Sequence, residues 1–377
     1  MRRLSMVRKR GFFLWHLLVL IMFLSCAVPG IAAEPVKIVV GWQPYDTISY
    51  QVAIIQELKL WKKYMPEGVE IEFQPALQGA IISNNLLAGK QQIGYMSILP
   101  AIMAATKPEQ ANIRLVASTG YDDGQRCAII MVRKDAPNFK TPDEAIKWLD
   151  GKTLAAPKGS CADQFVRLLI DKKKIKPKEY LNQSLEVIAT NFRVGKIDAA
   201  AAWEPTVSRV GDLVGEGVAR IALTGKAIDN IDSGALVMRG DFIDKYPKLA
   251  EAYIKAELDA QRYMLDPNNR EKVIDMLSKH ATGMSKRILW YSIYGQIPPQ
   301  VGGTKERAWR PFIWTDQLRR NIFDMYGFLH KEKIIKYDKP FQGTIDDTIA
   351  QKVLKDAKFK SPLGSIIGQP PSSDPFK

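Results

Sequence analysis

Cysteine and histidine are scarce in this chain of 377 residues, which contains three of each. So few thiols and imidazoles argue against zinc clusters, iron–sulfur centres and a dense disulfide scaffold. The sequence also lacks a glycine-rich phosphate loop and the HExxH, GxSxG and CxxC motifs. His280 and His330 are isolated on helical stretches, which is typical of surface residues. We therefore expect no catalytic residues, no metal site and no cofactor, and we predict that the protein is not an enzyme.

Acidic residues are absent from residues 1–33. A basic start, from Arg2 to Arg10, precedes an apolar run from Phe12 to Phe23 and a small-residue ending at Ala33. This order is typical of a secretory signal peptide, and cleavage after residue 32 or 33 fits it best. The alternatives are an uncleaved membrane anchor and lipid attachment at Cys26, although the residues before Cys26 match a lipoprotein signal poorly. We predict export to the periplasm.

Long apolar runs are absent beyond residue 33, where nothing approaches the ~20 residues that a membrane-spanning helix needs. The formal net charge is +14, but the charge beyond the leader is spread along the chain and does not alternate with aromatic residues. We therefore expect no nucleic-acid partner. After export, Cys127 and Cys161 would face an oxidising compartment, so a disulfide between them is one of two states that the sequence leaves open.

Short β-rich runs alternate with helical stretches through two successive parts of the chain. This alternation indicates an α/β fold with mainly parallel sheets. Strands are expected at 37–42, 69–73, 92–96, 113–117, 127–132, 153–157, 185–189, 197–202, 219–223 and 235–238. Helices are expected at 48–63, 79–89, from 100 onward, 141–149, 161–171, 241–264, 270–280 and 315–331.

Four segments carry a resemblance to a known family. They are the turn Gly41–Pro44, the helix end Leu86–Lys90, the sequence GKTLAAPKG ending at Gly159, and GKIDAAAAWEP from Gly195 to Pro205. Together they resemble the nitrate, sulfonate and taurine group of solute-binding proteins over about residues 36–330. The resemblance implies a class II periplasmic-binding-protein fold, in which two lobes with mixed, mainly parallel sheets are joined by a two-strand hinge.

The expected organisation follows from this fold. We expect a signal peptide at 1–33, a discontinuous first lobe at 34–130 plus 238–357, a second lobe at 131–237 and a flexible tail at 358–377. The chain should cross between the lobes near 128–133 and near 234–240. The resemblance also implies a monomer that delivers a small-molecule ligand to the permease and ATPase of an ABC importer in the inner membrane.

Ligands of open α/β sheets bind at the carboxyl ends of strands, beside helix N-termini. Backbone amides at the start of the helix after Ser160 suit an anionic group, whereas Trp203 could stack on the solute and Glu204 could accept from an amine. Turn, helix-cap and core roles are the structural alternatives. The candidate ligand-binding residues are Gln43, Tyr45, Gln78, Gly79, Ser97, Asp122, Ser160, Cys161, Trp203, Glu204 and Ser233.

The ligand class stays open at this point. A small anionic or zwitterionic solute, such as a sulfonate, taurine, nitrate or a related organic acid, fits the resemblance. The alternatives are uptake of a thiamine-pyrimidine-like heterocycle, a pyrimidine-synthase-like enzyme of the same fold, and a binding module that feeds a sensor kinase. The aromatic-rich segment 290–314 could roof the cleft or pack the C-terminal helices.

Overall fold

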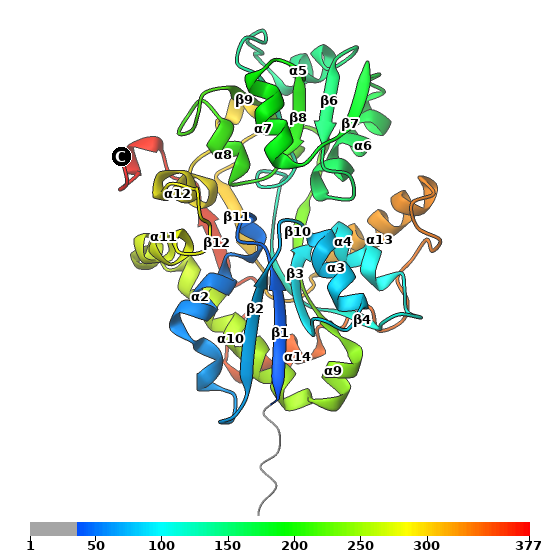
Figure 1. The fold of residues 1–377 in the computed structure, drawn as a ribbon, viewed down its shortest axis with the longest axis vertical. Helices are drawn as coiled ribbons and strands as arrows, with labels where there is room; N and C mark the ends of the chain where they lie inside the picture. Colours follow the sequence, from blue (N-terminus) through cyan, green and yellow to red (C-terminus); the bar gives the residue numbers. More distant parts are fainter. Residues whose placement is uncertain (1–35) are drawn as a thin grey trace, which may run out of the picture. The chain divides into compact units, whose positions relative to one another are not determined.

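The computed structural model describes residues 36–377, so the predicted signal peptide and Cys26 lie outside the described residues. Residues 37–377 form one compact unit built on two β-sheets (Figure 1). Among the helices of this described part, none has both the length and the apolar character that crossing a membrane requires.

The larger sheet has seven strands in the order β12-β11-β4-β10-β3-β1-β2. Strands β1, β2 and β3 run parallel, whereas β10 is antiparallel to β3 and β4, and β11 is antiparallel to β4 and β12. The strands are β1 (Lys37–Trp42), β2 (Glu70–Pro75), β3 (Ile93–Ser97), β4 (Ile113–Asp122), β10 (Asp232–Arg239), β11 (Glu306–Arg310) and β12 (Gly364–Ile367).

Helices pack against this sheet (Figure 1). One hydrophobic core lies under α3, α4 and α13, where Ile82, Ile102 and Leu318 are buried against Leu115 of the sheet. The helices are α2 (Gln51–Leu58), α3 (Gly79–Leu87), α4 (Ile98–Ala105), α9 (Gly240–Lys245), α10 (Pro247–Leu265), α11 (Arg270–Ser278), α12 (Lys286–Tyr294), α13 (Asp316–Lys331) and α14 (Thr348–Asp356).

The smaller sheet has five strands in the order β7-β6-β8-β5-β9, with its own hydrophobic core. Strands β6, β7 and β8 are parallel, and β5 is antiparallel to β8 and β9. The strands are β5 (Ile129–Arg133), β6 (Thr153–Ala156), β7 (Glu179–Asn182), β8 (Ala199–Ala202) and β9 (Ala219–Thr224). The helices are α5 (Pro142–Trp148), α6 (Cys161–Lys173), α7 (Leu185–Arg193) and α8 (Thr206–Val210).

The α/β fold with two mixed sheets is confirmed, but antiparallel pairing is more extensive than predicted, because β5 and β10 run against their neighbours on both sides. The strand predicted at 185–189 is wrong, because this segment begins helix α7. Ser184 caps that helix by accepting from the amide of Val187, and Leu185, Ile188 and Phe192 are buried at helical spacing.

The prediction of a flexible tail at 358–377 is wrong over part of its length. Strand β12 pairs with β11 in the larger sheet. Further on, Arg287 Nε donates to the buried carboxylate of Asp374 at 3.1 Å. Backbone pairing and an ion pair with a buried carboxylate hold these residues in place, which the polar composition of the segment did not indicate.

The chain passes between the sheets at 123–128, from β4 to β5, and at 225–231, from β9 to β10. Both crossings precede the predicted positions, because 129–133 and 232–239 are themselves strands. A third segment, 295–305, also reaches the smaller sheet, where Ile297 and Val301 join its core. Thr304 bonds to Gln125 of the first crossing through two contacts, of 2.5 and 2.9 Å. The hinge region therefore contains more than two chain segments.

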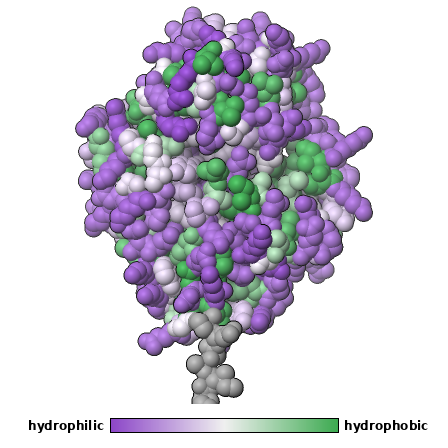
Figure 2. All heavy atoms as spheres, in the orientation of Figure 1, coloured by the Kyte–Doolittle hydropathy of each residue, from purple (hydrophilic) through white to green (hydrophobic). Residues whose placement is uncertain are grey.

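The aromatic residues of segment 290–314 serve packing. Trp290, Tyr294, Phe312 and Trp314 are all buried, and Trp314 belongs to the core under α13. Over the visible face, hydrophilic residues dominate and apolar residues form small patches (Figure 2). Segment 290–314 therefore contributes buried side chains to the protein interior, in part to the core of the smaller sheet, and does not line the cavities described below.

Candidate functional site

A narrow cavity lies where the turn after β1 meets the first turns of helices α3, α4 and α6 and the loop after β8. In this conformation it has room for little more than one water molecule. Its lining comes from both sheets and consists of Gln43, Asp46, Gln78, Gly79, Ala80, Ser97, Pro100, Gly159, Ser160, Cys161 and Trp203. Seven predicted ligand-binding residues are brought together here: Gln43, Gln78, Gly79, Ser97, Ser160, Cys161 and Trp203.

Three helix N-termini give this cavity its electrostatic character. Gln78 and Ser97 are the N-cap residues of α3 and α4, and neither side chain bonds to a helix amide within the described residues. Ser160 caps α6, and its Oγ accepts from the amide of Asp163 at 3.3 Å. Amide N–H groups at a helix start, together with the helix dipole, favour negative charge. The cavity is therefore suited to an anionic group.

Gly79 allows α3 and α4 to begin close together. A Cβ at this position would lie 2.7 Å from Cγ of Pro100 and 3.1 Å from Cβ of Met96. The first of these distances is too short for two carbon atoms in van der Waals contact. Only glycine therefore lets the first turn of α3 approach α4 and face the cavity.

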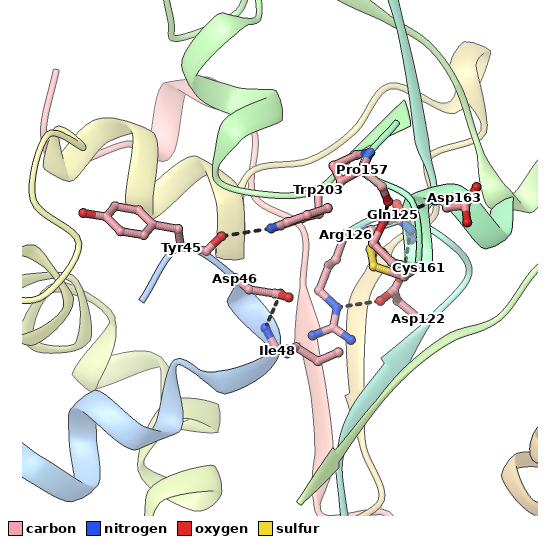
Figure 3. The surroundings of a disulfide bond; sticks show 12 residues. Tyr45, Asp46, Ile48, Asp122, Gln125, Arg126, Pro157, Cys161, Asp163 and Trp203 are labelled. Atoms are coloured by element: carbon pink, nitrogen blue, oxygen red, sulfur yellow. Dashed lines mark hydrogen bonds and ion pairs between the residues drawn. A yellow bond between two sulfur atoms is a disulfide. The ribbon is translucent and has the colours of Figure 1, made fainter. Parts of the chain in front are cut away.

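The turn after β1 carries Gln43 and Asp46. Its shape is held by Ser49, whose Oγ donates to the carbonyl of Gln43 at 2.7 Å and accepts from the amide of Gln43 at 3.1 Å. Asp46 Oδ1 accepts from the amide of Ile48 at 3.0 Å (Figure 3). Burial raises the pKa of Asp46 to about 7, although the Ile48 amide and the charge of Arg126 oppose the shift.

Asp46 was not among the predicted site residues. The one feature of the sequence that could have indicated Asp46 is its position shortly after a strand. Gln43 and Tyr45 were predicted as site residues because of this same position. A carboxylate in such a turn is more often a solvated cap. The α6 and β8 loops that line the cavity together with Asp46 belong to the other sheet, and sequence reasoning could not bring them close to this turn.

Trp203 joins the two halves of the site. Its indole Nε1 donates to the backbone carbonyl of Tyr45 at 3.1 Å, and only 3% of the residue is exposed (Figure 3). This hydrogen bond connects the loop after β8 to the turn after β1, and stacking of Trp203 on a solute stays a prediction. The Tyr45 hydroxyl lies further out and contacts the carbonyl and hydroxyl of Thr282 at 3.1 and 3.0 Å.

A wider and more open cavity adjoins the narrow one and shares Gln78 and Trp203 with it. Tyr45, also a predicted site residue, lies here and not in the narrow cavity. Its remaining lining residues come from the start of α3, the start of α7, helix α8 and the loop before α12: Leu77, Ile81, Ser184, Leu185, Glu186, Thr206, Arg209, Thr282 and Met284. This cavity forms the mouth of the site.

The structure does not bring Asp122 or Ser233 to either cavity lining. Asp122 is buried at the end of β4, where its carboxylate accepts from the amides of Gln125 and Arg126 and from Arg126 Nε at 2.5 Å (Figure 3). Ser233 is buried in β10, paired in register with Tyr121. Both residues support the crossings between the sheets.

Glu204 is also placed away from both linings. Its Oε2 accepts from the amide of Ser208 at 2.9 Å, and its Oε1 lies 3.5 Å from Arg307 Nη2. Arg307 also donates to the carbonyls of Gln125 and Ser292. Burial raises the pKa of Glu204, against the opposing charge of Arg307. The Glu204 carboxylate is thus part of a buried hydrogen-bond network with Ser208 and Arg307, outside both cavity linings. This position does not fit the predicted contact with a ligand amine.

Cys127 and Cys161 are joined by a disulfide, with a Cα–Cα distance of 6.0 Å (Figure 3). Cys127 lies in the first crossing between the sheets, and Cys161 is the first residue of α6. The disulfide therefore anchors the N-terminus of α6, which lines the cavity, directly to the hinge region. Both cysteines of the disulfide are buried, and Cys161 contributes to the cavity wall.

Solved structures show which class of fold this is. The alkanesulfonate-binding protein SsuA from Xanthomonas axonopodis pv. citri, bound to MOPS, matches with a TM-score of 0.63 at 17% identity, covering 83% of this chain and 99% of that one. The periplasmic nitrate-binding protein NrtA from Synechocystis PCC 6803 matches with a TM-score of 0.65 at 16% identity, covering 86% and 89%. The chain therefore has the fold of the periplasmic binding proteins.

The sequence itself identifies the family. The sequence model of the NMT1-like family matches residues 31–278, and the chain belongs to this family. Among curated proteins, the taurine-binding periplasmic protein of Escherichia coli K12 is 25% identical over 256 residues, which cover 66% of this chain and 73% of that protein.

Proposed function

We propose that this protein is an exported solute-binding protein that captures a small anionic or zwitterionic solute and delivers it to an ABC importer. The observation that carries the proposal is the meeting of three helix N-termini, those of α3, α4 and α6, at one cavity between two sheets. Such N-termini bind sulfonate, carboxylate or nitrate oxygens without requiring a basic side chain. Hinge closure around a ligand is the usual mode of action of two-lobed binding proteins.

The relatives support this reading. Their names describe binding proteins for taurine, alkanesulfonate and nitrate, which all present anionic oxygens. The same names favour binding over catalysis. We also propose a permease and an ATPase of an ABC importer as partners. The chain would act as a monomer, because a single copy contributes both walls of the cavity.

The two sheets, each with its own core, support a division into two lobes. The proposed lobes are 34–130 plus 238–357 and 131–237, with the exception that Ile297 and Val301 pack into the core of the second lobe. A periplasmic location is supported by the leader at 1–33 and by the disulfide, since disulfides persist in oxidising compartments. Lipid attachment at Cys26 is the alternative form of the exported protein.

The function is tested by thermal denaturation of the purified protein with a panel of sulfonates, carboxylates and nitrate. A ligand at 100 times its dissociation constant stabilises the folded state by about 2.7 kcal/mol, which shifts the melting temperature measurably. We expect at least one panel member to give such a shift. If no anion in the panel stabilises the protein, the proposal is wrong.

A pair of glycine variants tests whether the helix N-termini form the site. Gly79→Ala would place a Cβ against Pro100 and force α3 away from α4. Gly327→Ala in α13 is the matched control, because a Cβ there would meet no atom within 4 Å. We expect Gly79→Ala to abolish the ligand-induced shift and Gly327→Ala to retain it. Equal shifts in the two variants would place the site elsewhere.

A further inference from the structure

A carboxyl group lies beside the disulfide, where the two crossings between the sheets meet. The sulfur atoms of Cys127 and Cys161 and a carboxylate oxygen of Asp232 all lie within 4.8 Å of one another, and the three residues are buried. Cys127 belongs to the first crossing, Cys161 begins α6, and Asp232 begins β10 directly after the second crossing. Residues that are far apart in the sequence therefore bring two sulfur atoms and one oxygen atom together.

The Asp232 carboxyl has an oxygen that the folded chain leaves unused. Asp232 Oδ2 has no hydrogen-bond partner within residues 36–377, and only 4% of the residue is exposed. Buried polar atoms in proteins are normally paired. A disulfide cannot fill this role, because its sulfur atoms carry no proton to donate. Asp232 thus keeps a buried acceptor that is available to a further group at the cysteines.

Arg126 supplies positive charge at the same place. Its Nε is held by Asp122 at 2.5 Å, but both of its Nη atoms are buried and have no partner in the described part of the chain (Figure 3). The charge of Arg126 also acts on the Asp232 carboxyl. Two thiolates, one carboxylate and a divalent cation together leave a single negative charge. The guanidinium of Arg126 would balance that charge in the buried site.

We propose that the reduced form of this protein binds a thiophilic divalent cation, such as Zn²⁺ or Cd²⁺, through Cys127, Cys161 and Asp232. Reduction transfers two electrons and two protons from a thiol or phosphine reductant to the disulfide, and the cation then displaces the thiol protons. Thiolate and carboxylate ligands suit both ions. Water from the narrow cavity, whose wall includes Cys161, would complete the coordination.

The backbone already has the spacing that such a site requires. A tetrahedral Zn²⁺ with Zn–S bonds of about 2.3 Å holds its two sulfur ligands about 3.8 Å apart. The Cα atoms of Cys127 and Cys161 are 6.0 Å apart, so rotation of the two side chains is sufficient. Cys161 is the first residue of the 13-residue helix α6, where the helix amides favour a thiolate. The sequence alone predicted no metal site, because only the fold brings Asp232 to the cysteines.

This inference goes beyond solute capture and does not depend on the proposed function. Metal binding and disulfide formation compete for the same two sulfur atoms, so the cation belongs to the reduced chain and the disulfide to the oxidised one. The competition matters for a chain whose thiols are still reduced. A bound cation would delay the cross-link between the first crossing and α6.

Titration with Cd²⁺ tests the site in the mature chain. The protein is treated with a phosphine, the appearance of two free thiols per chain is confirmed, and oxygen and reductant are removed. We expect the reduced protein to bind one Cd²⁺ with the ultraviolet charge-transfer band of cadmium–thiolate bonds, and the disulfide form to give no such band. A reduced protein without the band would overturn the inference. So would a disulfide that the phosphine does not open in the folded protein, because the metal form could then not arise.

The variant Asp232→Asn tests the third ligand. Both thiolates remain, so the charge-transfer band should persist, but the dissociation constant for Cd²⁺ should rise about tenfold or more because a neutral amide replaces the carboxylate. The matched control is Asp229→Asn, whose side chain is 91% exposed, and it should bind as the wild-type protein does. Equal affinities in Asp232→Asn and the wild-type protein would exclude the three-ligand site.

Two measurements on the reduced wild-type protein do not depend on a variant folding. X-ray absorption at the zinc edge should count two sulfur ligands and otherwise oxygen ligands, and a shell without two sulfurs would contradict the site. Glutathione disulfide takes two electrons from the two thiols, forms the protein disulfide and releases two glutathione molecules. Zn²⁺ at 100 times its dissociation constant should slow this oxidation roughly a hundredfold, because only the metal-free dithiol reacts. An unchanged rate would overturn the inference.

Discussion

The indole N–H of Trp203 donates to the backbone carbonyl of Tyr45 at 3.1 Å, and this bond connects the loop after β8 of the smaller sheet with the turn after β1 of the larger sheet. Trp203 lines both the narrow cavity and its mouth. One side chain therefore contributes to the wall of the site and to the contact that holds the two halves together around it.

Replacing Trp203 with phenylalanine should weaken ligand binding by up to about tenfold, because the variant retains an aromatic surface but loses the hydrogen bond between the loop after β8 and the turn after β1. Calorimetric titration with the best-binding panel member measures this loss. Small-angle scattering of the ligand-free variant should show a larger radius of gyration. Trp148→Phe in α5, which packs against Phe139, is the control and should leave binding unchanged. Wild-type affinity in Trp203→Phe would show that the bond does not stabilise closure.

Removing the disulfide with Cys127→Ser and Cys161→Ser should lower the free energy of unfolding by about 3–4 kcal/mol in the chain-entropy model, for a sequence separation of 34 residues. Urea denaturation measures the difference. A reducing agent should destabilise the wild-type protein by a similar amount and leave the double variant unaffected. If the reducing agent changes both proteins equally, the loss has another cause.

Arg307→Met should destabilise the protein by about 3–5 kcal/mol, because it leaves Glu204 buried without a compensating charge. Adding Glu204→Leu to this variant should restore part of the loss in urea denaturation. Arg193→Met removes one partner of the exposed pair with Glu216 and should cost less than about 1 kcal/mol. Equal effects at the two arginines would mean that burial of the first pair does not matter energetically.

Stability should fall as the pH rises from about 4.5 to 7, because of the buried carboxyl of Glu257. Tyr95 Oη and Gln261 Nε2 donate to it at 2.7 and 2.8 Å, and burial raises its pKa to about 7. In this window the unfolded chain releases the proton while the folded protein keeps it, so ionisation favours unfolding. The loss should be of the order of 3 kcal/mol for Glu257 alone.

Urea denaturation at pH 5 and 7.5 measures this loss, and Glu257→Gln should reduce the difference between the two pH values. Asp46 acts in the same direction, since its pKa is also raised to about 7, so part of the dependence should persist in the variant. An unchanged pH dependence in Glu257→Gln would exclude this carboxyl as a cause.

Much of the cavity lining could be predicted because the position of a residue relative to the predicted strands and helices was enough to place it at the site. Gln43, Gln78, Ser97 and Ser160 each follow a strand or begin a helix, and the carboxyl ends of parallel strands meet at one edge of a sheet. For the same reason, Trp203 was found from the segment that follows β8. These residues required no knowledge of distant contacts.

The errors concern contacts between distant parts of the chain. Glu204 follows a strand as well, but Arg307, which lies 103 residues further on, determines where its carboxylate points. Asp46 gave no sign of burial in the sequence, because the loops that share its cavity come from the other sheet. The apolar run at 185–189 was too short for its periodicity to separate a strand from a helix, and tertiary burial of α7 decided the outcome.

Segment 295–305 has a consequence for how the molecule can be divided. By sequence it follows helix α12 of the larger-sheet half, yet Ile297 is fully buried in the core of the smaller sheet and Gly302 accepts from the Thr224 hydroxyl at 2.8 Å. A fragment that comprised only residues 131–237 would lack Ile297 and would expose to water the part of the smaller-sheet core that Ile297 covers. Expression of an independent second lobe would therefore require grafting this short, distant piece of chain onto the fragment.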